Sequence, residues 1–161
     1  MKLPFALSLV MGVVLLGAGC ASNELASKVN NFAESGMLST KMDLSGTGLT
    51  AVPGNIFDRG DLTELNLSNN SLTGALPSQI GQLKNLRLLN ASRNQMTGVP
   101  SEIGQLSKLE ALDLSNNQLT GLPNELGQLS NLRLLDLRGN DVSQPDLAGI
   151  RLKLTNTTII E

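Results

Sequence analysis

The sequence contains no histidine, tryptophan or tyrosine, and Cys20 is its only cysteine among 161 residues. These absences exclude Ser–His–Asp and Cys–His catalysis, and zinc sites built from histidine and cysteine. A disulfide within one chain is excluded as well. Enzymes that use carboxylates alone, and calcium sites with oxygen ligands, stay compatible with this composition.

Aromatic residues and concentrated positive charge are also scarce. Three phenylalanines are the only aromatic residues, so the core must be aliphatic, and a sugar ring or a very tight protein interface would find few stacking partners. The chain has 12 basic and 14 acidic residues, for a formal charge of −2. No basic cluster follows the first residues, which argues against nucleic acid as a partner.

The first twenty residues have the pattern of a secretory signal. Lys2 supplies a positive charge, residues 3–16 are almost entirely apolar, and small residues at 17–19 precede Cys20. The apolar run is shorter than the roughly 20 residues that a membrane-spanning helix needs. We therefore expect residues 1–19 to direct export and then to be removed.

The end of this run, Leu16-Gly17-Ala18-Gly19-Cys20, resembles the lipobox of bacterial lipoproteins, although Gly17 stands where that family usually has leucine. The resemblance implies that palmitate and related acyl chains are attached at Cys20, which anchors the mature protein in a membrane. Ala21, in place of aspartate, implies the outer membrane if the source is Gram-negative. The alternative is an ordinary signal peptide that happens to end near a cysteine.

From residue 39 onward the chain repeats itself in units of 23 or 24 residues: 39–61, 62–85, 86–108 and 109–131. Within each unit two apolar residues flank one polar residue, and this period of two predicts a short strand with one buried face. One strand per unit, all in the same direction, predicts a parallel sheet. The apolar pairs are Met42 and Leu44, Leu65 and Leu67, Leu89 and Ala91, Leu112 and Leu114, and Leu135 and Leu137.

Residues 109–119, LEALDLSNNQL, resemble the leucine-rich repeat, L-x-x-L-x-L-x-x-N-x-L. The resemblance covers about residues 39–142. It implies an α/β fold: a leucine-rich-repeat solenoid in the form of a short curved horseshoe, with the parallel sheet on its concave face. The proline of each unit, followed by isoleucine or leucine, predicts a short 3₁₀ turn or an irregular helix on the convex side, and the extra residue within 72–77 predicts a local bulge there.

One asparagine recurs at the ninth position of the units, at Asn70, Asn94, Asn117 and Asn140. A buried asparagine can bond backbone groups that a turn leaves unpaired. Stacked copies therefore predict an internal structural ladder. Thr47 takes this place in the first unit, where we expect a weaker rung.

A solenoid exposes apolar faces at its ends and so needs caps. Residues 23–35 show helical spacing of apolar side chains, which predicts an N-terminal capping helix. After Asn140 the repeat pattern degrades, and we interpret 143–161 as a C-terminal cap. The predicted organisation is a signal peptide over 1–19, a lipidated N-terminus and capping helix over 20–38, repeats over 39–142, and the cap.

Departures from the repeat among the outward-facing strand residues predict a binding surface on the concave face. Leu88, Ala111 and Leu134 form an apolar line, and Arg93 and Arg138 replace smaller residues. Apolar side chains with arginine nearby are typical of binding hot spots. The candidate set is Glu64, Leu88, Asn90, Arg93, Ala111, Asp113, Leu134, Asp136 and Arg138.

These observations favour a non-enzymatic, membrane-anchored module of the bacterial envelope that binds a protein or peptide through its concave face. We expect no cofactor and no metal. The alternative is a structural or scaffolding lipoprotein without a discrete ligand site. Catalysis by carboxylates such as Asp113 and Asp136 is disfavoured, because the repeat spacing implies no pocket around them.

Overall fold

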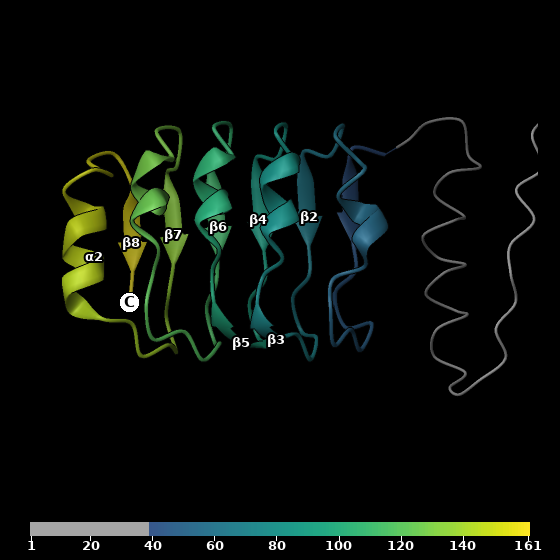
Figure 1. The fold of residues 1–161 in the computed structure, drawn as a ribbon, viewed down its shortest axis with the longest axis horizontal. Helices are drawn as coiled ribbons and strands as arrows, with labels where there is room; N and C mark the ends of the chain where they lie inside the picture. The colour runs from purple at the N-terminus through teal and green to yellow at the C-terminus, as the bar shows by residue number, and fades with distance from the viewer. Residues whose placement is uncertain (1–38) are drawn as a thin grey trace, which may run out of the picture. The chain divides into compact units, whose positions relative to one another are not determined.

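The computed structural model describes residues 39–161, which form a stack of similar layers (Figure 1). Cys20, the predicted signal peptide and the predicted N-terminal capping helix lie outside the described residues. Within residues 39–161, no helix is both long and apolar enough to cross a membrane.

Six short strands form one parallel sheet, in the order β1-β2-β4-β6-β7-β8. The register places Met42 beside Leu65, and then Leu89, Leu112 and Leu135 in line. The predicted solenoid, with one strand per repeat, is therefore confirmed. The strands are β1 (Lys41–Asp43), β2 (Glu64–Asn66), β4 (Leu88–Asn90), β6 (Ala111–Asp113), β7 (Leu134–Asp136) and β8 (Thr158–Ile160).

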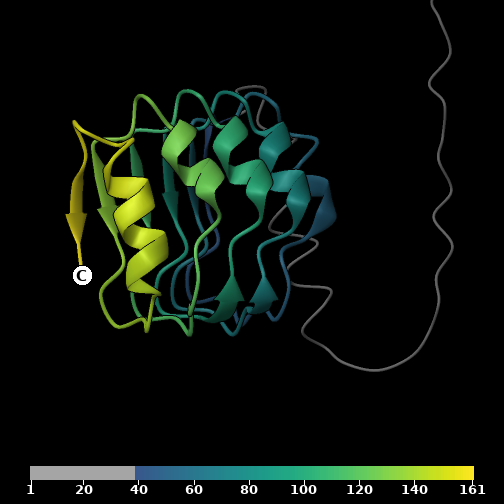
Figure 2. The same cartoon turned by 60° about the vertical axis from the view of Figure 1, so that its left-hand side comes forward.

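A row of 3₁₀ helices lies on the side of the stack opposite the six-stranded sheet (Figure 2). Each helix follows the proline of its unit, whose extended backbone leads into it, and of the two predicted alternatives the structure has the 3₁₀ form. The apolar side chains of strands and helices meet between the two rows and form the aliphatic core. The helices are η1 (Gly54–Ile56), η2 (Ser78–Gln82), η3 (Ser101–Gln105) and η4 (Asn124–Gln128).

Glycine sets the spacing between neighbouring 3₁₀ helices. A Cβ atom on Gly104 would lie 2.5 Å from the backbone oxygen of Glu125 in the next layer, and one on Gly81 would lie 2.9 Å from the oxygen of Glu102. Both distances are shorter than a van der Waals contact, and the atoms met are backbone. The layers therefore approach this closely only because a side chain is absent.

The extra residue of the second unit lies beside a local irregularity. A second, two-stranded sheet joins β3 (Thr73–Ala75) to β5 (Gln95–Gly98), and its register shifts between Gly74 and Ala75. Gly74 has a φ of +69°, which favours glycine. The sequence thus predicts the place of the irregularity.

The C-terminal segment contains more regular structure than the sequence predicts. Helix α2 (Gln144–Arg151) packs against η4, with Leu147 and Ile150 buried. The chain then returns as β8, which pairs in parallel with β7 and adds a sixth strand to the sheet. The sequence does not reveal this strand, because β8 contains no leucine, whereas β2, β4, β6 and β7 each have leucine at the central position.

Candidate functional site

The three-residue strands of the main sheet direct their first and third side chains away from the core, and we call the surface that these residues form the outer sheet face. This is the face that the sequence analysis predicts as concave. Its first row is Lys41, Glu64, Leu88, Ala111, Leu134 and Thr158, and its second row is Asp43, Asn66, Asn90, Asp113, Asp136 and Ile160.

Three apolar residues of the first row stand side by side on adjacent strands. Leu88 pairs with Ala111, and Ala111 pairs with Leu134. Leu88 is 40% exposed and Leu134 is 37% exposed, while Ala111 is half-buried. The structure thus brings together the predicted apolar line, which we call the leucine strip.

Charged residues flank the leucine strip on two sides. At the N-terminal ends of the strands, Nη2 of Arg87 lies 2.6 Å from Oε1 of Glu110. In the first row itself, next to Leu88, Oε1 of Glu64 lies 2.8 Å from Nζ of Lys41. These pairs border a hollow of about 430 Å³, which Leu88 and Thr63 also line. The candidate Glu64 therefore already has an ion-pair partner.

Arg87, Glu110 and the exposed Arg133 are surface residues that the sequence analysis missed. They precede β4, β6 and β7 by one residue, and backbone bonds hold them in line: Glu110 N–H donates to Arg87 O at 2.8 Å, and Arg133 N–H donates to Glu110 O at 2.8 Å. The signal that could have found them is their alternating charge at one repeat position.

The second row has a structural role in addition to its place on the outer sheet face. Oδ1 of Asp113 accepts the backbone N–H of Ser115 at 2.9 Å, and Oδ1 of Asn90 accepts that of Ser92 at 3.0 Å. These bonds form the turn that follows each strand. Asp43 makes the same bond with the N–H of Ser45, which lowers the pKa of Asp43. Asparagine and aspartate in this row are thus explained without a ligand.

Asp136 and Arg138 form one ion pair rather than two separate contacts for a partner. Nη2 of Arg138 lies 2.6 Å from Oδ2 of Asp136, and its Nε lies 3.0 Å from Oδ1. The side chain of Asp136 is only 7% exposed. Hydrogen bonding from the Arg138 side chain holds the pKa of Asp136 below its usual range. The two residues thus largely satisfy each other's charge.

Arg93 has an unusual backbone conformation. Its φ is +54°, in the left-handed region, and the equivalent residues of the other repeats are Gly46, Asn69, Asn116 and Gly139, all with positive φ. Asparagine and glycine tolerate this conformation, whereas arginine is strained in it. Gly and Asn recur here because the turn requires them, and Arg93 is the exception.

We expect Arg93→Asn to raise the free energy of unfolding by about 0.5–1 kcal/mol, because asparagine is less strained at positive φ. Arg93→Ala, which removes the guanidinium but keeps a strained residue, should leave stability within about 0.5 kcal/mol of the original chain. Urea denaturation measures all three proteins. If the asparagine variant were no more stable than the alanine variant, strain would not distinguish this position.

The recurrent asparagines form a ladder, in which each side chain is hydrogen-bonded to the backbone of its own layer and of the preceding layer. Nδ2 of Asn117 donates to Leu114 O at 2.9 Å within its own layer and to Ala91 O at 3.0 Å in the preceding layer, and its Oδ1 accepts the N–H of Met96 at 3.1 Å. Asn94 and Asn117 are buried, while Asn70 and Asn140 are half-buried with equivalent bonds. In the first layer, Thr47 makes one such bond, from Oγ1 to Leu44 O at 2.8 Å.

No group of three or more histidine, cysteine, aspartate or glutamate side chains within residues 39–161 is placed to hold a metal ion. Asp113 and Asp136 are register partners, but Arg138 occupies the oxygens of Asp136. The described surface is therefore one of apolar side chains and ion pairs, which is suited to contact with another chain.

A family model described as a leucine-rich repeat region matches residues 36–153. Among solved structures, a leucine-rich repeat protein of Leptospira interrogans is 46% identical, with a TM-score of 0.66, over 70% of this chain and 28% of that one. The plant peptide hormone receptor RGFR1 in complex with RGF2 is 30% identical, with a TM-score of 0.59, over 68% of this chain and 18% of the receptor.

One curated relative is an enzyme subunit, the 3′–5′ exoribonuclease subunit Ccr4 of the CCR4-Not complex of Schizosaccharomyces pombe. It is 49% identical over 53 residues, which are 33% of this chain and 8% of Ccr4. The chain thus spans less than a third of the length of each of these three proteins. The similarity to Ccr4 is confined to a small fraction of that protein.

Proposed function

Because this chain belongs to the leucine-rich repeat proteins, we propose that it binds a protein or peptide partner on the outer sheet face, without catalysis. The observation that carries this proposal is the leucine strip, three apolar residues in register on adjacent strands with two of them more than a third exposed. Exposed apolar side chains grouped on one face are typical of binding sites.

The charges around the strip favour a partner of mixed charge. Arg87 and Glu110 alternate in sign next to the strip, and Arg133 is exposed beyond them. Apolar contacts would supply most of the binding free energy, and the charged rim would orient the partner. The solved complex of RGFR1 with RGF2 supports this proposal by analogy, because that receptor is structurally similar and is bound to a partner.

A photo-reactive residue placed at Ala111, in the centre of the strip, tests this proposal in living cells. We expect irradiation to join the chain to a discrete partner, because Ala111 lies between the two exposed leucines. The same residue at the exposed Gln128, at the end of η4 on the opposite side, should give no such product. Products at neither position would favour the scaffold alternative, and a product at Gln128 alone would place the interface on the 3₁₀ helices.

We also propose that acyl chains on Cys20 anchor the protein to the bacterial cell envelope, in the outer membrane if the source is Gram-negative. The lipobox-like run before Cys20 supports this proposal. Two or more acyl chains would make the anchor stable, because each buried CH₂ adds about 0.8 kcal/mol.

Cys20→Ala should abolish incorporation of labelled fatty acid and move the protein out of the membrane fraction, because the sulfur that carries the lipid is lost. Radiolabelling and fractionation measure both effects. Ser22→Ala, a nearby change that keeps the cysteine, is the matched control and should be labelled like the original chain. Equal label in the Cys20→Ala variant would refute lipidation at this residue.

A further inference from the structure

In the asparagine ladder, each asparagine side-chain amide is held by the same set of backbone hydrogen bonds. In each rung the Oδ1 atom accepts a backbone N–H from the preceding layer, and the Nδ2 group donates to a backbone oxygen of that layer. The four N–H donors of this row are Leu49 at 3.0 Å, Leu72 at 3.0 Å, Met96 at 3.1 Å and Leu119 at 3.0 Å.

The next donor in this row is the N–H of Val142, which has no acceptor within residues 39–161. The matching acceptor is Leu137 O. Leu114 O, one layer earlier, accepts from both Asn117 and Asn140, each at 2.9 Å, whereas Leu137 O accepts only from Asn140 among the described residues. Within residues 39–161, this donor and this acceptor thus have no partner from a further rung, and they belong to the same layer.

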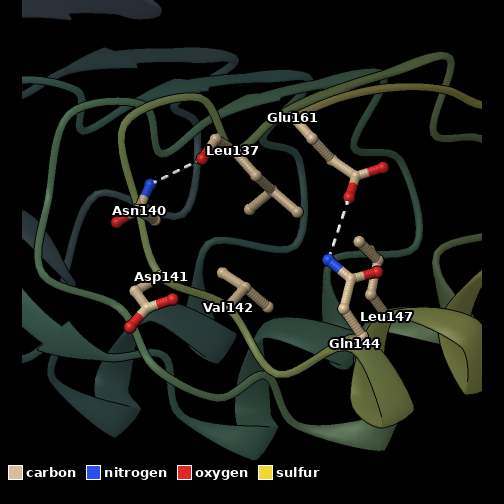
Figure 3. Close-up of a pocket in the computed structure, with 7 residues that line it drawn as sticks. All are labelled: Leu137, Asn140, Asp141, Val142, Gln144, Leu147 and Glu161. Carbon is tan, nitrogen blue, oxygen red and sulfur yellow. Dashed lines mark hydrogen bonds between the residues drawn. The ribbon is translucent and has the colours of Figure 1, made fainter.

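A pocket opens at this place (Figure 3). Its volume is about 120 Å³, and Leu137, Val142 and Leu147 supply its apolar lining. The pocket is larger than the space that a single water molecule needs, and it can admit a small group such as acetamide. At its rim, Nε2 of Gln144 donates to Oε2 of Glu161 at 3.3 Å.

We propose that this pocket binds a primary carboxamide, carried by an asparagine side chain of a partner protein. Such a group accepts the Val142 N–H through its oxygen and donates to Leu137 O through its nitrogen, which repeats the bonds of the four rungs inside the molecule. A carboxylate has no hydrogen to donate to Leu137 O. A tertiary amide also lacks the donor.

Strand β8, next to the pocket, offers the partner an edge for strand pairing. β8 pairs with β7 on one side, and no residue within 39–161 pairs with its other side. A partner strand could add to this edge, as in recognition by strand addition, and the turn after it would carry the asparagine into the pocket. β8 contributes Thr158 and Ile160 to the outer sheet face, but none of the residues that line the pocket belongs to that face, so the two sites can be tested separately.

Titration of the ¹⁵N-labelled protein with acetamide, followed by NMR, tests the chemical specificity. We expect a saturable shift of the Val142 amide signal in the range of tens of millimolar, and shifts at least five times smaller with acetate or N,N-dimethylacetamide. Val142→Pro removes the donor and should abolish the acetamide response, while the spectrum of the remaining residues shows that the variant is folded. Equal responses to the three compounds, or none, would overturn the proposal.

A peptide that copies residues 111–119 distinguishes an asparagine on a polypeptide from a free amide, since it carries the strand, the turn and the rung residue Asn117. We expect it to shift Val142 at a concentration at least tenfold lower than acetamide does, and the same peptide with Asn117→Ala to lose this advantage. Equal binding of the two peptides would overturn the proposal. A response to acetamide with none to either peptide would overturn the assignment to a partner protein and identify a free amide as the ligand.

Discussion

Asn117→Ala is expected to lower the free energy of unfolding by about 3 kcal/mol, a large part of the roughly 5–15 kcal/mol that stabilises a typical domain. The change removes the acceptor of the Met96 N–H and the donor to Leu114 O and Ala91 O. Met96 is only 1% exposed, so water cannot replace the lost acceptor. An unpaired buried donor alone costs about 1–3 kcal/mol, and the two lost carbonyl bonds add to this cost.

Urea denaturation monitored by circular dichroism measures this effect. Asn55→Ala is a matched control, because Asn55 is exposed and its side chain makes no hydrogen bond within residues 39–161, so stability should change by no more than about 0.5 kcal/mol. Asn140→Ala should fall between the two, since Asn140 is half-buried at the end of the row. Equal stability of all three variants would show that the ladder does not hold the layers together.

The periodic features of the fold could be predicted from the sequence because residues at equivalent positions have the same surroundings in every layer. Leu65, Leu89, Leu112 and Leu135 share one environment, so their spacing predicts both the strand and its register. The same holds for the asparagine row and for the 3₁₀ helices after each proline. Leu88 and Leu134 were also predictable, because an apolar residue at an outward position departs from the pattern.

Features that depend on a single side-chain conformation or on the end of the stack could not be predicted. The ion pair between Asp136 and Arg138 forms because the Arg138 side chain turns back toward Asp136, two residues earlier in the chain. The alternation of side chains along a strand does not reveal this contact. The strain at Arg93 was missed because the sequence analysis considered Arg93 only as a binding residue, although glycine and asparagine at the equivalent positions indicate positive φ. β8 escaped detection because it lacks the leucine pattern and reaches the sheet only after α2.

Replacement of both exposed leucines, Leu88→Glu with Leu134→Glu, is expected to weaken partner binding at least 100-fold, which corresponds to about 2.7 kcal/mol. The two side chains would supply the apolar contact area, and glutamate would instead place two charges against the partner's apolar surface. Stability should change by less than about 1 kcal/mol, because neither leucine belongs to the core. Arg138 is left unchanged, since its loss would leave the buried Asp136 without its partner.

A matched variant carries the same added charge on the opposite side of the stack. Gln82→Glu with Gln128→Glu alters the exposed last residues of η2 and η4, and neither side chain is hydrogen-bonded within residues 39–161. The 3₁₀ helices should lie outside the interface, so binding should stay within about twofold. Thermal unfolding of both variants should show that they are folded before their binding is compared.

The dissociation constant of the partner identified by cross-linking at Ala111, measured by titration against the original chain and these two double variants, tests the proposed function most directly. The account predicts at least a 100-fold weaker complex for the Leu88→Glu, Leu134→Glu variant and an unchanged complex for the Gln82→Glu, Gln128→Glu variant. Unchanged binding by the leucine variant, or loss of binding only in the glutamine variant, would contradict a binding site on the outer sheet face.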